Sequence, residues 1–341
     1  MTMRVRTILM AVMVVGAALG AVGAEAQQTV TWKAALFGPP RALTKPVDWW
    51  AHEVATRTNG QVKIELIYGE ALAKATEIPE GLRAGAFEMG LFCAAYYPGK
   101  FPLYTVLDLP MLTPDDVRVQ ARAEIALGEH PALVAEMKRW NAKLLLPAPL
   151  PQYQIMGQKK ITRAEDFKGL RIRVSGEMAR VLEDFGAVKS LVPAPEVYPS
   201  LERGVVDAVA FPATYAFFSY RVHEIAKYFI DRISLGSQPC FYGVNLAAWE
   251  KLTPAQQKIM LDLREPVVQQ FYEAYAADDA KNYDLFKQKG VELVNFPPAE
   301  RARLTANAEK HWQAWVEEKE KRGLPGRSVL EFVQGRLRAR P

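Results

Sequence analysis

The sequence has few of the residues that most often carry catalysis. Its 341 residues include four histidines and two cysteines. None of the histidines forms an H-x-x-x-H pair or a Cys/His pair at metal-binding spacing. The G-x-S-x-G, Walker and G-x-G-x-x-G motifs of hydrolases and nucleotide-binding proteins are also absent. These absences argue against an enzyme, and we expect neither a bound metal nor a cofactor.

Long apolar runs and clusters of one charge sign are scarce as well. The net charge of +5 at pH 7 is spread over segments of mixed sign, which argues against nucleic-acid binding. The one long apolar run, residues 8–22, follows Arg4 and Arg6 and precedes Ala24 and Ala26, as in a secretory signal peptide. An uncleaved anchor is the alternative, but the run is shorter than the ~20 residues of a membrane span. We predict cleavage after Ala26 and export.

The two cysteines, Cys93 and Cys240, lie far apart in the sequence. An exported protein can join them in a disulfide. Alternatively, both are buried free thiols that pack as small hydrophobic side chains. Because the sequence does not show that they are close in space, we favour free thiols.

Strand and helix signals alternate in the first part of the chain, which predicts an α/β fold. We expect strands at 30–37, 62–68 and 89–94, a helix from Thr44 to the Asn-Gly pair at 59–60, and a second helix at 77–86. This βαβαβ order implies a parallel sheet with right-handed crossovers. Helices broken at His130 and a strand at 143–146 follow, and the proline-rich segment 147–151 is the predicted crossing to a second domain.

A long helical pattern covers residues 254–289. Pro266 leaves two alternatives open, one helix that braces both domains or two helices broken at Pro266. A strand at 291–296, a helix at 299–322 and a basic C-terminal helix are predicted to follow.

The most informative segment is residues 166–212. Its strand 170–174 places Leu170, Ile172 and Val174 on one face and Arg171 and Arg173 on the other. Ser175 is the predicted N-cap of a helix that ends at Gly186, Pro195 begins a short helix, and a strand follows at 205–211. Ligands of α/β proteins lie at the carboxyl ends of strands, and arginine binds carboxylates through two parallel hydrogen bonds. The segment therefore predicts an anion site.

The same segment carries a family resemblance. It reads D-F-K-G-L-R-I-R-V, then F-G-A, then P-x-P-E-V-Y-P-S-L-E-R-G-V-V-D-A. Weaker agreements follow in order over nearly the whole chain: W-K-A-A-L-F-G-P-P, G-L-R-A-G-A-F-E-M-G and W-E-K-L-T-P-A-Q-Q. Together these motifs resemble the substrate-binding subunits of tripartite ATP-independent periplasmic (TRAP) transporters, of the dicarboxylate-binding (DctP) type.

The resemblance implies a two-lobed periplasmic binding protein with parallel-rich sheets, joined by crossing strands and a long helix. Lobe I would comprise 27–150 and about 239–278, and lobe II 151–238 and about 279–341. Such a protein is a periplasmic monomer that closes over a small organic acid and delivers it to integral-membrane subunits. Arg173 is the residue that the resemblance assigns to the ligand carboxylate, whereas Arg171 would face solvent or the other lobe.

The chain departs from its relatives at Phe211, where many of them have asparagine before a proline. The strand at 152–158 also lacks the basic residue that many relatives carry. Both changes remove polarity, so we expect a monocarboxylate with an apolar or aromatic body, such as an aromatic acid or a 2-oxo acid. A C4-dicarboxylate is the alternative ligand. A sensor-coupled binding protein and a periplasmic enzyme acting on a carboxylic acid are the alternative functions.

The remaining candidate ligand contacts are side chains from both lobes. Arg41 is either a second cation for the ligand or a solvated surface residue. The others would supply aromatic walls or neutral hydrogen bonds, and they are Phe37, Tyr96, Tyr215, Gln154 and Gln238. Further aromatic side chains nearby, such as Tyr97, Phe217, Phe218, Phe241 and Tyr242, serve either the pocket or the core.

Overall fold

The computed structural model describes residues 29–338 and contains two β-sheets. The predicted signal peptide and its predicted cleavage site lie outside the described residues. The first sheet has the order β2-β1-β3-β10-β4. Its strands are β1 (Val30–Ala35), β2 (Val62–Ile67), β3 (Met89–Cys93), β4 (Ala142–Pro147) and β10 (Cys240–Asn245). Because β1 pairs in parallel with both β2 and β3, the predicted βαβαβ unit is confirmed.

The second sheet has the order β11-β9-β5-β8-β6-β7. Its strands are β5 (Tyr153–Gly157), β6 (Arg171–Arg173), β7 (Val188–Ser190), β8 (Ala208–Pro212), β9 (Tyr228–Asp231) and β11 (Glu292–Asn295). Strand β6 pairs in parallel with β7 and β8, while β5 runs antiparallel to β8 and β9. The sequence did not predict β7, a three-residue edge strand whose exposed side chains show no apolar alternation.

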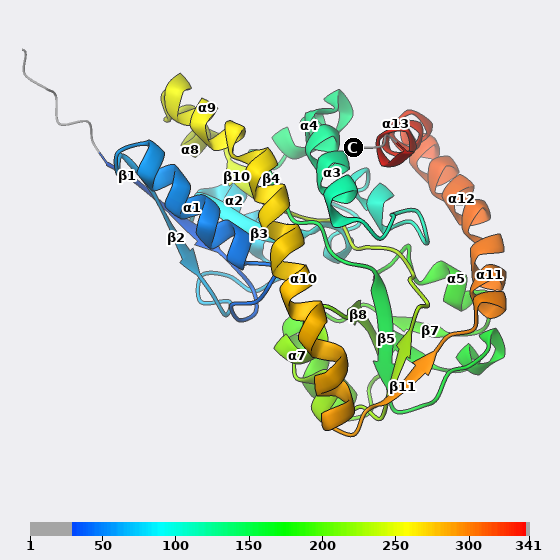
Figure 1. Ribbon diagram of the computed structural model, residues 1–341. Coiled ribbons are helices and arrows are strands. Elements are labelled where there is room, and N and C mark those ends of the chain that lie inside the picture. Colours follow the sequence, from blue (N-terminus) through cyan, green and yellow to red (C-terminus); the bar gives the residue numbers. More distant parts are fainter. Residues whose placement is uncertain (1–28, 339–341) are drawn as a thin grey trace, which may run out of the picture.

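Helices cover both sheets and join them (Figure 1). They are α1 (Lys45–Arg57), α2 (Ile78–Ala84), α3 (Val117–Glu129), α4 (Pro131–Lys138), α5 (Arg180–Glu183), α6 (Val197–Glu202), α7 (Ala216–Ser219), α8 (Leu246–Glu250), α9 (Pro254–Asp262), α10 (Arg264–Gln288), α11 (Pro298–Ala306), α12 (Ala308–Lys321) and α13 (Gly326–Arg338). Within residues 29–338, no helix is both long enough and apolar enough to span a membrane.

The molecule has two lobes, one built on each sheet. The chain passes from the first sheet to the second between β4 and β5 and returns between β9 and β10. Helix α10 runs past both lobes and contacts α1, α3 and β11 (Figure 1). The C-terminal helices lead back from the second lobe, and α13 packs against α3 of the first. The predicted α/β two-lobed fold is therefore confirmed, while the residues that bound each lobe remain a prediction.

The long helical pattern contains a break, but not at the proline itself. Helix α9 ends at Asp262 and α10 begins at Arg264, which places Pro266 in the first turn of α10. A proline is tolerated there because the first turn has no intrahelical partner for its missing N–H. The pattern at 299–322 likewise divides, into α11 and α12, at Asn307.

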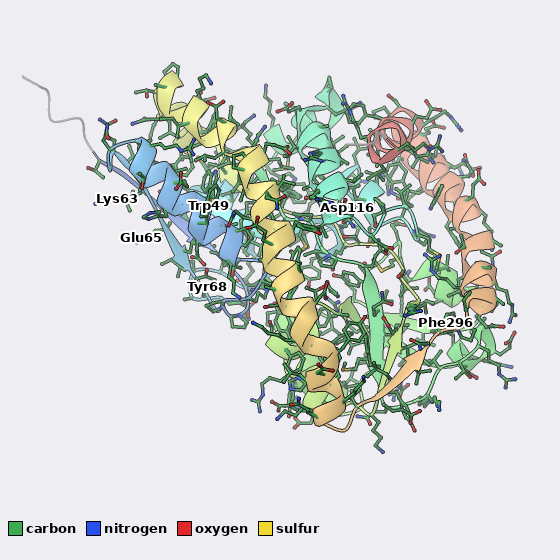
Figure 2. All side chains as sticks on the ribbon, in the orientation of Figure 1. Trp49, Lys63, Glu65, Tyr68, Asp116 and Phe296 are labelled. Atoms are coloured by element: carbon green, nitrogen blue, oxygen red, sulfur yellow. A yellow bond between two sulfur atoms is a disulfide. The ribbon has the colours of Figure 1, made fainter. Side chains whose placement is uncertain are left out.

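Burial follows the alternation expected from the sequence. In β2, Val62 is buried while Lys63 and Glu65 are exposed, and Figure 2 shows the two charged side chains at the outer edge of the first lobe. The largest core side chains include Trp32 and Trp50 of the first lobe, both fully buried. These packed faces hold the strand ends from which the site side chains extend.

The two cysteines form a disulfide, so our preference for free thiols was wrong. Cys93 and Cys240 are register partners in the antiparallel pair β3–β10, with Cα atoms 3.9 Å apart. This pairing depends on the return of the chain at residue 240 to insert β10 between β3 and β4. Residues that are 147 positions apart in sequence thus become neighbours.

The helix predicted after Ser175 is shorter than expected. Helix α5 has four residues and begins at Arg180, and Ser175 does not cap it. The Ser175 hydroxyl instead donates a hydrogen bond to the Asp108 carboxylate of the first lobe. The Ser175 side chain therefore joins the two lobes and does not cap a helix, contrary to the prediction from the local sequence.

Candidate functional site

A narrow cavity of about 20 Å³ lies between the two lobes. We call it the aromatic cavity. Both lobes line it: the first supplies the loop after β1, the end of β3 and the start of β10, and the second supplies the start of β5, the end of β8 and the segment that follows β8. The lining residues are Phe37, Arg41, Leu43, Cys93, Tyr96, Leu150, Tyr153, Ala194, Phe211, Pro212, Tyr215, Ala216, Tyr220, Gln238 and Cys240.

Arg173, at the end of β6, is fully buried beside this cavity. Its Nε donates to the Val192 carbonyl at 2.8 Å, and its Nη1 donates to the Ala210 carbonyl at 3.0 Å. Its Nη2 donates to the Tyr96 hydroxyl at 3.1 Å, across the gap between the lobes. The guanidinium is therefore held firmly in place. Of its five N–H groups, these bonds use three.

The neighbouring Arg171 behaves differently. It is exposed and pairs with Asp207 through Nε at 3.1 Å and Nη2 at 2.8 Å. Hydrogen bonding and charge from Arg171 lower the pKa of Asp207. Arg171 therefore faces solvent and carries its own counterion, whereas Arg173 is buried and has no ion-pair partner within residues 29–338.

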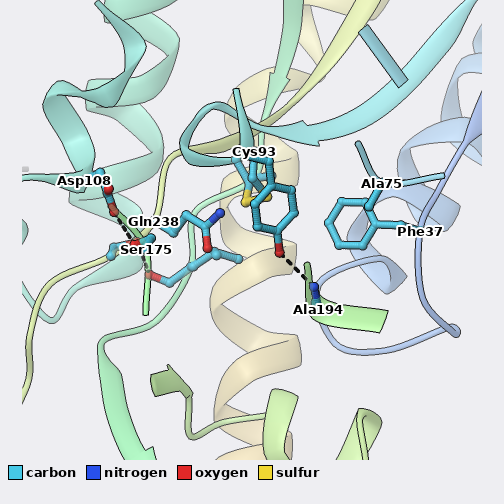
Figure 3. The surroundings of a disulfide bond; sticks show 12 residues. Phe37, Ala75, Cys93, Asp108, Ser175, Ala194 and Gln238 are labelled. Carbon is cyan, nitrogen blue, oxygen red and sulfur yellow. Dashed lines mark hydrogen bonds between the residues drawn. A yellow bond between two sulfur atoms is a disulfide. The ribbon is translucent and has the colours of Figure 1, made fainter. Parts of the chain in front are cut away.

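Tyr96 connects the two lobes at the edge of the cavity. Its hydroxyl accepts hydrogen bonds from Arg173 and from the Ala194 backbone N–H, the latter at 3.1 Å. Figure 3 shows this bond to Ala194, with Phe37 on one side and the disulfide of Cys93 behind. A first-lobe side chain thus fixes the position of the second-lobe arginine.

Aromatic rings form a continuous wall between two arginines. The Arg173 guanidinium lies 4.3 Å from the centre of the Phe211 ring, and Phe211 stacks on Tyr220 with ring centres 5.4 Å apart. The Arg41 guanidinium then lies 5.6 Å from the Tyr220 ring and 5.3 Å from the Phe37 ring. Both arginines thus gain cation–π contacts on faces sheltered from water.

Arg41 is only 4% exposed, so the solvated alternative is wrong. Its Nη1 donates to the carbonyls of Phe37 and Pro39 at 2.9 and 2.8 Å. Thr44, which precedes α1 without capping it, bonds through its hydroxyl to the Arg41 backbone. Gly38 has φ +71° in this turn, and a Cβ there would collide with the Tyr220 hydroxyl. The loop after β1 therefore folds Arg41 back toward the cavity.

Several buried donors around the cavity have no partner. Six buried side-chain polar atoms within residues 29–338 lack a hydrogen bond, and four of them belong to residues that line this cavity. These four are Nε and Nη2 of Arg41, the Tyr220 hydroxyl and Nε2 of Gln238. Buried polar atoms without partners are rare because each costs free energy. Their concentration here indicates a place for an acceptor.

The tyrosine hydroxyls at the cavity are protonated donors at neutral pH. Burial raises the pKa of Tyr220 to about 12, although Arg41 acts in the opposite direction. Burial likewise raises the pKa of Tyr215, whose ring stacks on Tyr275 with centres 5.8 Å apart. Neither hydroxyl therefore contributes negative charge that would oppose an anion.

The two glutamines that sequence reasoning singled out lie in different places. Gln238 is buried, and its Oε1 accepts a hydrogen bond from the Tyr153 hydroxyl at 2.8 Å. Its amide nitrogen is a donor without a partner among the described residues. Gln154 is not among the cavity's lining residues. Its amide bonds to the side chain and backbone of Ser234 instead.

A second interlobe contact lies beside the cavity, between Asp108 and the segment after β6 (Figure 3). Asp108 accepts from the Ser175 hydroxyl and from the Glu177 backbone N–H, the latter at 2.8 Å. Burial raises the pKa of Asp108 to about 8, against the opposing effect of the Ser175 hydrogen bond. The contact joins the lobes close to Arg173.

Sequence reasoning missed Tyr153 and Tyr220 as cavity residues. Neither stands in a motif, and both reach the cavity only because the two sheets face each other. Conversely, Tyr97, Phe217, Phe241 and Tyr242 are buried in the core and absent from the lining of the aromatic cavity.

Comparison with known proteins adds a family and a set of related folds. The profile of the bacterial extracellular solute-binding protein family 7 (DctP) matches residues 39–319. The 2,3-diketo-L-gulonate-binding periplasmic protein of Escherichia coli (strain K12) is 25% identical over 247 residues, which cover 70% of this chain and 72% of that protein.

Two solved structures share the fold. A TRAP solute-binding protein from Rhodoferax ferrireducens T118, in complex with copurified benzoate, has a TM-score of 0.82 and 22% identity, covering 91% of this chain and 98% of that one. A TRAP periplasmic solute-binding protein from Bordetella bronchiseptica, with bound (R)- and (S)-mandelate, has a TM-score of 0.80 and 24% identity, covering 90% and 98%.

Proposed function

Because the chain belongs to the bacterial extracellular solute-binding protein family 7, as the substrate-binding subunit of a TRAP transporter, we propose that it captures a small monocarboxylic acid with an apolar or aromatic body. It does so in the periplasm and delivers the acid to the integral-membrane subunits. The observation that carries the proposal is the aromatic cavity, which both lobes line, with Arg41 in its lining and Arg173 beside it. Aromatic walls next to these two cations suit an anion with a flat apolar body.

Arg173 is the residue we assign to the carboxylate. It is fully buried, and within the described residues its hydrogen bonds go to two carbonyls and a tyrosine, with no ion pair. A buried cation without an anion is costly. A ligand carboxylate supplies that anion, and the two N–H groups outside these bonds give charge-assisted hydrogen bonds in return for lost hydration.

Phe211 supports an apolar ligand body. Where many relatives place a polar amide, this chain places a ring that covers Arg173 and stacks on Tyr220. Aromatic walls favour rings and branched apolar groups. The related folds with bound benzoate and mandelate are in keeping with this ligand class.

The lining of the cavity supports binding without chemical conversion. It includes one arginine, several tyrosines and one side-chain amide but no aspartate, glutamate or histidine, and so it lacks the acid/base pair that proton-transfer catalysis uses. We therefore propose a receptor that returns its ligand unchanged. A sensor-coupled receptor would share this cavity and differ in its membrane partner.

Native mass spectrometry of the freshly purified protein tests the proposal. We expect a bound species with the mass of a monocarboxylic acid, recovered with the same mass after release. A thermal-shift panel of acids then ranks ligands. If succinate stabilises the protein more than every aromatic or 2-oxo acid, the monocarboxylate assignment is wrong. If an added acid is converted during incubation, the receptor assignment is wrong.

A further inference from the structure

Arg41 presents an unused hydrogen-bonding edge to the aromatic cavity. Its Nη1 is occupied by the Phe37 and Pro39 carbonyls, and the two unpartnered atoms are Nε and Nη2. These two nitrogens form the side-on edge of a guanidinium, whose parallel N–H groups bind a pair of oxygens.

The same edge binds oxygen pairs elsewhere in this chain. Arg171 holds Asp207, and Arg118 holds Asp116, through Nε and Nη2 in each case. Arg221 holds Glu224 in the same way. These three arginines face water and have carboxylate partners. Within residues 29–338 the same edge of Arg41 has no partner at hydrogen-bonding distance, although the Tyr215 hydroxyl is close enough to interact with this guanidinium.

Two further unpartnered donors belong to the lining of this cavity. The Tyr220 hydroxyl lies close to Arg41, because the same Gly38 turn abuts both side chains. The Gln238 amide nitrogen is free because Tyr153 holds its oxygen. With Arg173 assigned to a carboxylate, this set offers more donors than the two oxygens of a plain carboxylate can use.

We propose that Arg41, Tyr220 and Gln238 form a second oxygen-binding subsite that selects acids with an oxo or hydroxyl group beside the carboxylate over the corresponding plain acids. This inference rests on the proposed function and specifies its ligand class. Oxo and hydroxyl oxygens supply the missing acceptors, and a plain acid leaves buried donors unpaired, which costs affinity.

Phenylacetate and three acids that carry an added group on its α-carbon test the subsite by isothermal titration calorimetry. Phenylacetate is the plain acid, mandelate adds a hydroxyl, phenylglyoxylate adds an oxo group and phenylmalonate adds a second carboxylate. We expect the wild-type protein to bind mandelate or phenylglyoxylate at least about tenfold more tightly than phenylacetate, as loss of a charge-assisted hydrogen bond implies.

The decisive variant is Arg41→Met, which keeps the length of the side chain and removes its donors. It should reduce the preference to within about twofold, because mandelate and phenylglyoxylate lose more affinity than phenylacetate does. Arg41→Lys keeps a cation that can bond the Phe37 carbonyl but lacks the side-on edge. It should also lose the preference, and it serves if the Met variant does not fold. Arg118→Met removes an equivalent edge at the surface and should bind as the wild type does.

Three outcomes would overturn the subsite: no wild-type preference over phenylacetate, tightest binding of phenylmalonate, or an unchanged preference in both folded Arg41 variants. Equal loss of all four acids in a folded Arg41 variant would also overturn it, because Arg41 would then be the main anchor. The proposed function fails separately, if the wild-type protein binds none of the four acids or if Arg173→Ala binds them normally.

Discussion

Two hollows in this molecule differ in size, lining and hydrogen bonding. The larger, with a volume of about 560 Å³, is an open polar groove next to α10. It is lined by Asp115, Pro151, Gln152, Gln154, Ala213, Thr214, Asp231, Arg232, Ser234, Asp279, Tyr283 and Arg301. The aromatic cavity has a volume of about 20 Å³. By size alone, the groove would be the candidate site.

The hydrogen bonding in the two hollows favours the aromatic cavity as the candidate site instead. In the groove, Gln154 is paired with Ser234, Tyr283 with Asp231, and Arg301 with the Ile233 carbonyl. None of the buried unpartnered atoms in residues 29–338 belongs to a groove residue. The buried polar atoms of the groove residues have hydrogen-bond partners, whereas the cavity contains buried donors without acceptors. Unpaired buried donors indicate where an acceptor can bind, which volume alone does not.

The charges in the two hollows also favour the aromatic cavity as the anion site. The groove carries Asp115, Asp231 and Asp279 beside its arginines, and burial raises the pKa of Asp279. The lining of the cavity contains a cation and no carboxylate. An organic anion is therefore repelled by carboxylates in one hollow and attracted by unpaired guanidinium groups at the other.

The largest effect is expected from Arg173→Ala. Removing one partner of a buried charge pair costs about 2–5 kcal/mol, so affinity for the preferred acid should fall at least about thirtyfold. Titration calorimetry measures the loss, and circular dichroism verifies that the fold is intact. Near-wild-type binding by the folded variant would remove Arg173 from the site.

The Asp108 contact makes stability depend on pH. Because burial raises the pKa of Asp108 from 3.8 to about 8, the folded state retains a proton that the unfolded state releases. The resulting stabilisation is full below about pH 4 and is lost as pH rises through about 8, by at most about 1.4 kcal/mol per pH unit.

Asp108→Asn should therefore flatten the fall in the free energy of unfolding between pH 5 and pH 8. Urea titrations at several pH values measure it, and the difference from the wild-type protein isolates Asp108 from other buried acids. Parallel curves for the two proteins would show that Asp108 does not hold a proton in the folded state.

Tyr96→Phe tests the link between the lobes. The change removes the hydroxyl that accepts from Arg173 and Ala194 but keeps the ring beside Phe37. Loss of one hydrogen bond of ordinary strength, about 0.5–1.5 kcal/mol, should weaken acid binding about three- to tenfold. An unchanged dissociation constant would mean that the Tyr96 hydroxyl does not support the bound state.

The smallest effect is expected in the groove. Arg232 is exposed and lies 3.8 Å from the Asp231 carboxylate. Arg232→Gln should leave acid binding within about twofold of wild type, because exposed ion pairs contribute little. It is the matched control for Arg173→Ala. A large loss of affinity would move the ligand from the cavity to the groove.

The sequence predicted the elements better than the contacts between them. The βαβαβ unit and the strand that ends at Arg173 follow from local periodicity and turn residues. The disulfide does not, because Cys240 reaches Cys93 only through the topology of β10. The role of Ser175 does not follow from local pattern either, because its hydroxyl bonds to Asp108 of the other lobe and does not cap a helix.

The candidate site shows the same division. The residues around Arg173 form a contiguous pattern, so its place beside the cavity could be expected. Arg41 stands in a Pro-rich loop, where a solvated side chain is the ordinary expectation, and its burial depends on Tyr220 and Phe37 packing around it. Packing between residues far apart in the sequence decides whether such a side chain is buried. A single sequence gives no local signal of that packing.

A crystal structure of the protein with the acid that binds best in the thermal-shift panel tests the central claim most directly. We predict the carboxylate within hydrogen-bonding distance of Arg173, with the apolar body against Phe211 and Tyr220 in the aromatic cavity. An acid bound instead in the polar groove, with its carboxylate on Arg232 or Arg301, would contradict this account.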